Sequence, residues 1–296
     1  MEKKDLYQRI TDKIVCQLEQ DVRPWQQPWN GGTSVFPLRH NGIAYRGVNI
    51  LALWMEAAEK GYSSPRWMTF KQALDLGGHV RKGETGSLTV YADKLTRSEK
   101  DAATGEEAAQ EIHYLKGYTV FNADQIDGLP ESYYAKPPLR NESLKRITRA
   151  EAFFAATGAA IVHGGSSAYY IPRTDNIHMP CFDVFDDAES YYATLAHECT
   201  HWTAHEKRLD RSFGRKRWGD EGYAMEELVA ELGAAFLCTT LELTPEPRED
   251  HASYLANWLK VLKDDKRAIF TAASHAQRAA DFLNGFQSAT AEGAAA

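Results

Sequence analysis

Two histidines and a glutamate in the C-terminal half of the chain have the spacing of a catalytic metal site. The segment YYATLAHECTHWTAHEKRL contains His197, Glu198 and His201. Residues four apart lie on one face of a helix, so both imidazoles can reach a single ion. Glu198 then points beside that ion, where a general base must lie to take a proton from water. The pattern predicts a metal-dependent hydrolase site, with zinc as the expected metal and manganese as the alternative.

A second segment, residues 223–241, supplies carboxylates for this site. It is apolar almost all round, which is typical of a buried helix, and buried carboxylates need a cation or a hydrogen-bonding partner. At 100° per residue, Glu231 lies about 40° from Glu227 on the helix. We therefore predict Glu227 as the third ligand and Glu231 as the residue that orients a histidine ring. Glu226, about 100° away, is expected at the solvated rim. Ion pairs with arginine or lysine are the alternative for these carboxylates.

Several neighbouring groups have weaker claims to a role in the site. His205 lies eight residues after His197, but the EKRL that follows it favours a surface position. Cys199 points away from the metal face and is expected to be a core thiol. His251 and Tyr254 are candidates for stabilising an oxyanion, although capping or packing explains either residue equally well. The four cysteines are widely scattered and lack the paired spacing of a structural zinc site, so we expect free thiols.

The elements that must position these residues fall into two parts with a proline-rich joint between them. Residues 128–143 contain three prolines that interrupt both helical and strand patterns. The sequence predicts an α+β fold of two domains: an N-terminal α+β domain and a mainly helical C-terminal domain with a small sheet. Their expected limits are residues 1–130, a linker over 131–146, and residues 147–296. The predicted elements are helices over 5–20, 47–61, 66–78 and 149–157, strands over 87–98 and 113–122, an extended section over 168–180, and at least three further helices, the first of them capped by Asp186 or Asp187.

Charge and aromatic residues in the first half indicate a polyanionic partner. The net charge is −7, yet residues 23–100 hold 11 Lys and Arg against 6 Asp and Glu, whereas residues 131–296 hold 18 against 24. Binding to single-stranded DNA needs cations for phosphates and flat aromatic faces for bases. Tyr45 and Arg46 lie on a turn between glycines, and Arg81 and Lys82 lie on another. The full set of DNA-binding candidates is Tyr45, Arg46, Arg81, Lys82, Trp25, Arg39 and Lys71. Three other aromatics have helical spacing and are expected in the core: Trp54, Trp67 and Phe70.

Composition excludes a membrane role. The chain is 43% hydrophobic and 25% charged, and no apolar run approaches the length needed to cross a bilayer. The N-terminal segment is charged and lacks the apolar core of a signal peptide. We therefore expect a cytoplasmic protein without a membrane partner.

With these residues in view, the chain resembles the ArdC antirestriction proteins of conjugative plasmids. That family joins a single-stranded DNA-binding domain to a zincin-like metallopeptidase domain. The resemblance covers nearly the whole chain and is carried by YRGVNILALW, WMTFKQALDLGGHVRKGETG and YTVFNADQIDGL in the first half, and by FFAATGA, AYYIPRTDNIHMP, YYATLAHECTHWT and EELVAELGAAFL in the second. It implies that the protein binds incoming single strands and shields a plasmid from host restriction. In related zincins a Glu ligand with an acidic or amide residue four positions later maps onto Glu227 and Glu231.

Three functions remain open at this point. The first is an antirestriction protein with a metallopeptidase-like site, whose partners are single-stranded DNA and a host restriction protein or DNA-bound protein as target. The second is a DNA-templated metalloprotease that degrades proteins bound or crosslinked to single strands. The third is a binding protein whose metal only braces the fold. The presence of Glu198 favours the first two, because a purely structural site does not need a base.

Overall fold

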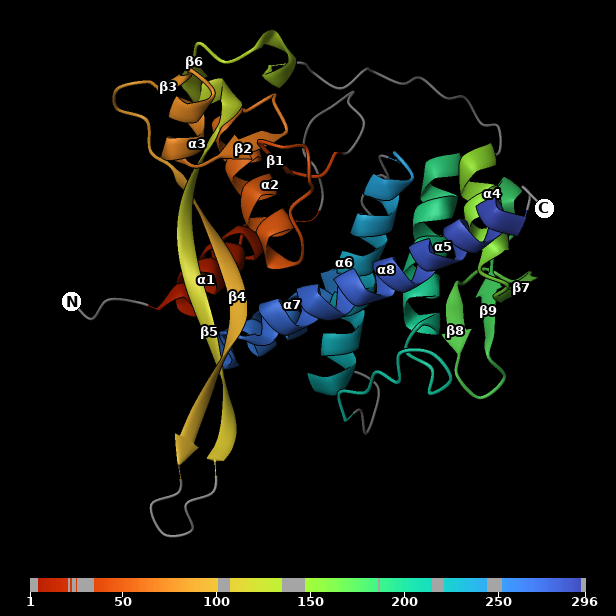
Figure 1. Cartoon of the computed structure of the whole chain (residues 1–296). Coiled ribbons are helices and arrows are strands. Elements are labelled where there is room, and N and C mark those ends of the chain that lie inside the picture. Colours follow the sequence, from red (N-terminus) through yellow and green to blue (C-terminus); the bar gives the residue numbers. More distant parts are fainter. Residues whose placement is uncertain are drawn as a thin grey trace.

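The computed structural model describes residues 5–20, 22, 25, 35–100, 107–134, 147–185, 187–214, 221–243 and 252–293. Strands and short helices of the N-terminal half lie on one side, and long helices of the C-terminal half lie on the other (Figure 1). The predicted α+β class is confirmed. None of the described helices combines the length and the apolarity that a bilayer span requires.

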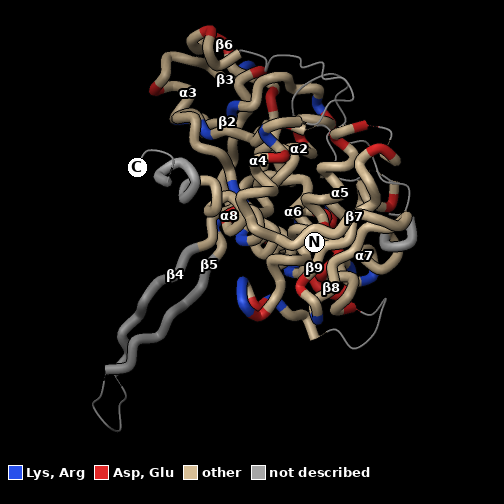
Figure 2. The backbone as a smooth tube through the Cα atoms, turned by 90° about the vertical axis from the view of Figure 1, so that its right-hand side faces the viewer, with Lys and Arg blue, Asp and Glu red and all other residues tan. Residues whose placement is uncertain are grey.

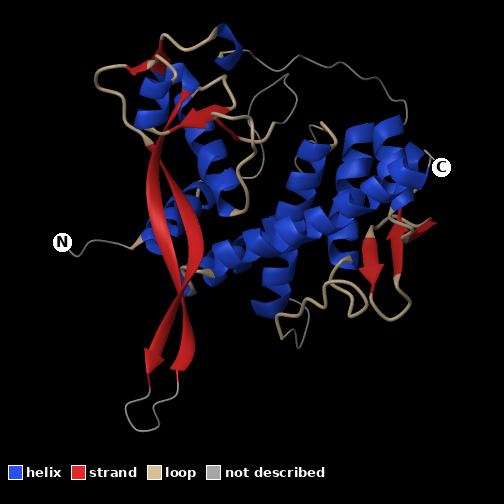
Figure 3. Cartoon of the chain, in the orientation of Figure 1, coloured by secondary structure: helices blue, strands red, loops and turns tan. Residues whose placement is uncertain are grey.

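The N-terminal half is built around a four-stranded sheet in the order β1-β2-β5-β4. Its longest strands, β4 and β5, form an antiparallel hairpin paired from Ser87↔Val120 to Lys100↔Glu107, which projects beyond the helices (Figure 3). A second small sheet pairs β3 with β6. In chain order the elements are α1 (Leu6–Leu18), β1 (Leu38–Arg39), α2 (Val48–Lys60), β2 (Arg66–Met68), α3 (Phe70–Asp75), β3 (His79–Val80), β4 (Ser87–Lys100), β5 (Glu107–Asn122) and β6 (Ile126–Asp127), with short 3-10 turns at Ala123–Gln125 and Glu131–Tyr133.

Local signals explain most of these boundaries, with one correction. Gly61 ends α2 in the left-handed conformation, at φ 69°, which glycine adopts without strain. The single helix predicted over residues 66–78 is wrong in its first part. Arg66–Met68 pairs with β1 and β5 as strand β2, because sheet pairing outweighs the weak helical preference of three residues. The helix begins only after Thr69, whose side chain accepts from the backbone N–H of Gln72 in a capping box.

The C-terminal half packs helices beside a three-stranded sheet in the order β7-β9-β8. Strand β7 runs parallel to β9, and β8 runs antiparallel to it. The sequence indicated the extended region of β8 and β9 but not β7. Helix α8 runs from α2 across α6 to α4 (Figure 1). The elements are α4 (Thr148–Ala156), β7 (Ala160–His163), β8 (Tyr169–Ile171), β9 (Asn176–Met179), the 3-10 turn Phe182–Val184, α5 (Ala188–Trp202), α6 (Glu221–Thr240), α7 (Ala252–Asp264) and α8 (Ala268–Gly293).

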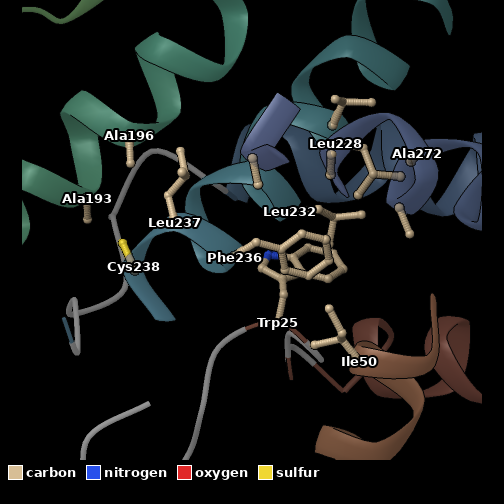
Figure 4. Packing of buried hydrophobic residues seen from close by; sticks show 14 of the residues in the cluster. Trp25, Ile50, Ala193, Ala196, Leu228, Leu232, Phe236, Leu237, Cys238 and Ala272 are labelled. Carbon is tan, nitrogen blue, oxygen red and sulfur yellow. The ribbon is translucent and has the colours of Figure 1, made fainter. Parts of the chain in front are cut away.

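Both halves contribute to one continuous hydrophobic core. Ile50 of α2 and the aromatic ring of Trp25 lie beside Phe236 and Leu232 of α6 (Figure 4). Elsewhere in the same core, α1 packs against α7. Residues 135–146 of the expected linker lie outside the described residues. The division into domains over 1–130 and 147–296 stays a prediction from the sequence, and in space the two parts share their apolar interior.

The shared core corrects one predicted DNA contact. Trp25 is only 4% exposed, and its ring makes an edge-to-face contact with Trp258 at a centroid distance of 5.6 Å. A base cannot stack on a ring that is already covered by another part of the protein. We therefore withdraw Trp25 as a base-stacking residue and assign it to the core that joins the two halves.

Candidate functional site

Helix α5 presents the two histidines of the HExxH motif on one face. Asp187 caps the helix, accepting from the backbone N–H of Ser190 at 2.6 Å, as one of the two predicted caps. His197 and His201 follow one turn apart, and their Nε2 atoms lie 3.2 Å from each other. Both imidazoles therefore direct the same nitrogen at a common point.

Helix α6 brings Glu227 to that point. Its Oε2 lies 3.4 Å from Nε2 of His197, and its Oε1 lies 3.5 Å from Nε2 of His201. One ligand atom from each of the three residues lies within 4.8 Å of the other two. Ligands bound tetrahedrally to zinc at about 2.0–2.1 Å are separated from one another by about 3.3 Å. The three groups therefore have the separations and the N, N, O chemistry that suit a divalent ion with one open position.

The two ligand-bearing helices approach closely because of Gly233. A Cβ built at this position of α6 would lie 2.5 Å from Cγ2 and 2.6 Å from Oγ1 of Thr200 on α5. Only hydrogen fits in that space without a shift of the helices or of the threonine. Thr200 is itself held by its hydroxyl, which donates to the carbonyl of Ala196 at 2.8 Å. The glycine thus permits the interhelical distance at which Glu227 reaches both histidines.

Glu231 lies beside the nitrogen of His197 that faces away from Glu227. Its Oε1 is 3.2 Å from Nδ1, although it lies off the line of the N–H, so the contact is electrostatic rather than a well-aligned hydrogen bond. Glu231 is buried, as is the imidazole it faces. Its assignment as the residue that orients His197 stays a prediction.

Glu226 does not lie at the solvated rim, where the sequence predicted it. Its side chain is only 18% exposed, and its Oε1 lies 3.1 Å from Nδ1 of His201. The angle of about 100° around the helix separates Glu226 from Glu227, and Glu227 points toward the ion. The Nδ1 atom of His201 faces away from the ion, however, so a carboxylate well off that axis is the one that meets it. Each histidine therefore has its own carboxylate partner.

The carboxylates around the two histidines raise the pKa values of both imidazoles. Burial opposes the charged form of His197, but the carboxylates of Glu227 and Glu231 outweigh it and raise its pKa to about 9. The pKa of His201 is also raised well above its ordinary value by Glu227 and Glu226, against the same effect of burial. Conversely, the two imidazoles lower the pKa of Glu227, although burial alone would raise it.

Glu198 lines the same cleft as the ligands and is itself buried. The cleft has a volume of about 890 Å³. Its walls come from β8 and the turn after it, from the segment that follows α5, and from the first turns of α6. Glu198 therefore lies on the wall of a space large enough for a substrate, next to the ligand set, as a general base requires.

The groups with weaker claims take ordinary positions. Cys199 is fully buried, and burial raises the pKa of its thiol, which confirms it as a core residue. His205 is half-buried in the cleft wall, where its Nδ1 accepts from the backbone N–H of Lys207, and it does not belong to the ligand set. His251 and the side chain of Tyr254 lie outside the described residues. All four cysteines are free thiols, as expected.

The DNA-binding candidates on the turn before α2 have protein partners in this structure. Tyr45 is half-buried against a small apolar cluster that includes Trp67, and the guanidinium of Arg39 lies 5.5 Å from the ring centroid of Tyr45. Arg46 is exposed and forms an ion pair with Asp281 of α8. Arg39 therefore lies beside the ring of Tyr45, whereas Arg46 already faces a carboxylate of the C-terminal half.

A second group of candidates lies around α3 and β3. Arg81 pairs with Glu84 at 2.9 Å and with Asp127 at 3.3 Å, whereas Lys71 and Lys82 are exposed. Basic and acidic positions alternate in this region rather than forming one basic field (Figure 2). Of the aromatics expected in the core, Trp54 and Trp67 are buried, but Phe70 is 52% exposed and is corrected to a surface residue.

The hairpin carries a set of exposed residues, two of which, Lys116 and Tyr118, were missing from the predicted candidates. Tyr91 and Lys116 are paired across β4 and β5, and Tyr118 lies two residues further on the same face. The two tyrosines are 50% and 39% exposed, and the lysine ammonium lies 5.2 Å from the ring centroid of Tyr118. The alternation along strand β5 was visible in the sequence. Its partner register, which brings Tyr91 alongside, was not.

Both halves of the chain are similar to known protein families. Residues 4–121 match the family described as the N-terminal domain of anti-restriction factor ArdC, and residues 148–275 match a zincin-like metallopeptidase family. The uncharacterized protein y4eC of Sinorhizobium fredii (strain NBRC 101917 / NGR234) is 44% identical over 292 residues, which cover 96% of this chain and 93% of that protein. A DNA primase TraC of Escherichia coli is 37% identical over 307 residues, which cover 96% of this chain but only 27% of the primase.

Two crystal structures extend this similarity to the whole fold. The metal-free structure of the antirestriction ArdC protein from the R388 plasmid is 50% identical, with a TM-score of 0.82, and the alignment covers 96% of this chain and 98% of that one. The Mn(II)-bound structure of the same protein is 48% identical, with a TM-score of 0.81 and the same coverage. Identity at this level over both complete halves shows more than a shared fold. The chain belongs to the ArdC family of antirestriction proteins.

Proposed function

We propose that this protein is a plasmid antirestriction factor that binds single-stranded DNA during conjugative transfer and carries a divalent-metal peptidase site. The observation that carries the peptidase part is the geometry of His197, His201 and Glu227. Their ligand atoms have the separations of a tetrahedral ion, with the carboxylate of Glu198 on the same cleft. Membership of the ArdC family and the Mn(II)-bound structure of a relative support the antirestriction role and the metal.

The chemistry follows from the residues around the cleft. A divalent ion held there would polarise a carbonyl and make water a better nucleophile. Glu198 accepts the proton of the attacking water and passes it to the leaving nitrogen, which is the role of a general base and then of a general acid. His197, His201 and Glu227 hold the ion, and Glu231 orients the first imidazole.

A polypeptide is the substrate class that fits the cleft. Among the described strands, β8 pairs only with β9, so its other edge offers unpaired backbone groups. Tyr169 and Tyr170 of this strand line the cleft that also contains Glu198. An extended peptide can add to such an edge through main-chain hydrogen bonds. The same edge supports the second candidate function, a protease that acts on proteins bound or crosslinked to single-stranded DNA.

The peptidase proposal is tested with Glu198→Gln, and Glu206→Gln, at an exposed position on the same cleft, is the matched control. Each protein is incubated with DNA-binding proteins, with and without single-stranded DNA. Metal content is measured in parallel. We expect both variants to keep the metal and only Glu198→Gln to lose cleavage. Activity that survives Glu198→Gln would exclude this base, whereas cleavage only in the presence of DNA would establish the DNA-templated protease. Metal binding without cleavage of any substrate would instead indicate a binding protein whose metal ion only stabilises the fold.

The DNA-binding proposal is tested on the full chain, because the two halves share one core. Single-strand affinity is measured by fluorescence anisotropy over a range of salt concentrations. Neutralising Lys116 or Arg46 should flatten the salt dependence, because each cation that contacts a phosphate releases counterions. Tyr118→Ala should weaken binding at all salt concentrations, by about 1–3 kcal/mol if a base stacks on the ring. Variants Arg81→Gln and Lys82→Gln test the second group of candidates in the same way, and unchanged affinity in all of these variants would refute the proposed surface.

A further inference from the structure

We propose that Arg211 is a positioning residue of the metal centre, which acts through Glu226 to fix the ring and the tautomer of His201. The inference rests on the metal site proposed above and adds to it a pair of residues outside the ligand set.

Arg211 is almost fully buried and bonded along its whole guanidinium. Its side chain is 1% exposed. Its Nε donates to Oε2 of Glu226 at 2.8 Å and its Nη2 donates to Oε1 at 2.7 Å, which is a bidentate pair. The other contacts go to the C-terminal turn of α5: Nη2 donates to the carbonyl of Thr200 at 2.9 Å, and Nη1 donates to Oγ1 of Thr203 at 3.1 Å. One cation therefore links the helix of the histidines to the helix of Glu227.

The carboxylate held by Arg211 determines which nitrogen of His201 faces the ion. Oε1 of Glu226 lies 3.1 Å from Nδ1 of His201. An ionised carboxylate can only accept, so a neutral His201 must carry its proton on Nδ1. The lone pair is then on Nε2, which is the atom that lies near Glu227 and His197. Such a hydrogen bond also restricts rotation of the ring and makes the ligand more basic.

The arginine is needed for this arrangement because the cleft is rich in carboxylates. Glu226, Glu227, Glu231 and Glu198 all line it. Without the bidentate partner, Glu226 would be a nearly buried negative charge next to three others, and its carboxylate would turn toward water or another cation. That movement removes the acceptor from Nδ1 of His201. A lysine keeps the charge but cannot offer the planar fork that holds both oxygens in place.

Arg208 provides a matched comparison on the same segment. It is also nearly buried, pairs with a carboxylate, and bonds the end of α5, since its Nε donates to the carbonyl of Trp202 at 2.6 Å. Its carboxylate partner is Asp175, on the turn between β8 and β9, and that carboxylate accepts from the hydroxyl of Tyr170 rather than meeting a histidine. Arg208 therefore braces the fold without contact to the ligand set.

The experiment compares Arg211→Met, Arg208→Met and the wild type. Zinc affinity is measured by competition with a chromophoric chelator, and thermal melting is measured on the metal-free proteins. The imidazole tautomers of the zinc-loaded proteins are read from two-bond ¹⁵N–¹H NMR correlations. We expect both substitutions to lower the melting temperature. Only Arg211→Met should also lower zinc affinity, by about 10–100-fold as for other outer partners of metal ligands, and disturb the Nδ1-protonated form of His201.

Wild-type affinity and an unchanged His201 tautomer in Arg211→Met would overturn the proposal and leave Arg211 a structural residue like Arg208. If Arg211→Met does not fold, Arg211→Lys and Glu226→Gln test the same contact with smaller changes, and wild-type affinity in both would be equally decisive against it. Failure of the underlying metal site is recognised separately. In that case the wild type binds no zinc, or His201→Ala binds it as tightly as the wild type does.

Discussion

Replacing Gly233 with alanine tests whether the distance between α5 and α6 sets the metal centre. The new methyl group would lie 2.5 Å and 2.6 Å from two side-chain atoms of Thr200, and 3.1 Å from its Cβ. Alanine gains roughly 1 kcal/mol in helix propensity over glycine. Overpacking in a core costs about 1–3 kcal/mol. The upper part of that range applies because Thr200 is fully buried and its hydroxyl is bonded to Ala196. We expect a net loss of about 1–2 kcal/mol in the free energy of unfolding.

The same clash should act on the metal site, because any separation of the helices moves Glu227 away from both imidazoles. The assay is urea unfolding of the metal-free protein together with zinc affinity, in a double-mutant cycle with Thr200→Ala. Thr200→Ala removes both atoms that would lie closer than 3.0 Å, so the coupling between the two substitutions should be favourable by roughly 2–3 kcal/mol, which is the overpacking cost that the threonine causes. A Gly233→Ala protein with wild-type stability and zinc affinity, or a cycle with no coupling, would refute this reasoning.

Three further predictions concern other parts of the chain. Asp281→Asn should raise single-strand affinity, because it releases Arg46 from its ion pair. The gain should be at most about fivefold, which corresponds to the free energy of an exposed ion pair. The same gain in an Arg46→Gln background would contradict this mechanism. Burial and the neighbouring guanidinium groups of Arg278 and Arg211 lower the pKa of His275 to about 4. Above pH 6.5 the imidazole is neutral in the folded and the unfolded state and contributes nothing to the free energy of unfolding. As the pH falls from 6.5 towards 4, the unfolded chain binds the proton before the folded protein does, so the free energy of unfolding should decline. His275→Gln should flatten this decline, which is measured from urea midpoints. Trp25→Ala should cost about 3–5 kcal/mol of stability, since it removes a buried aromatic ring, while anisotropy titrations at a temperature where the variant is folded should show unchanged affinity for single strands.

The fold class and the metal motif were accessible from the sequence because they depend on local patterns. The one-turn spacing of His197 and His201 determines that they share a helix face wherever that helix lies. The apolar surroundings of Glu227 and Glu231 indicated a buried helix whose carboxylates need partners. In each case, the pattern lies within a few turns of one helix. The β2 strand shows the limit of such local patterns, because three residues with weak preferences adopt the conformation that their sheet partners require.

By itself, the sequence determined that a buried helix pair would carry two histidines and a glutamate, since helical periodicity relates residues a few positions apart. The tertiary structure decided which carboxylate meets which imidazole, so that Glu226 and not only Glu231 contacts a histidine. It also decided that Trp25 belongs to a core shared by both halves, although its aromatic ring and its place in a basic segment had suggested a DNA contact. These outcomes depend on how separate elements pack, and the contacts that settle them join residues far apart in the chain, which no local periodicity encodes.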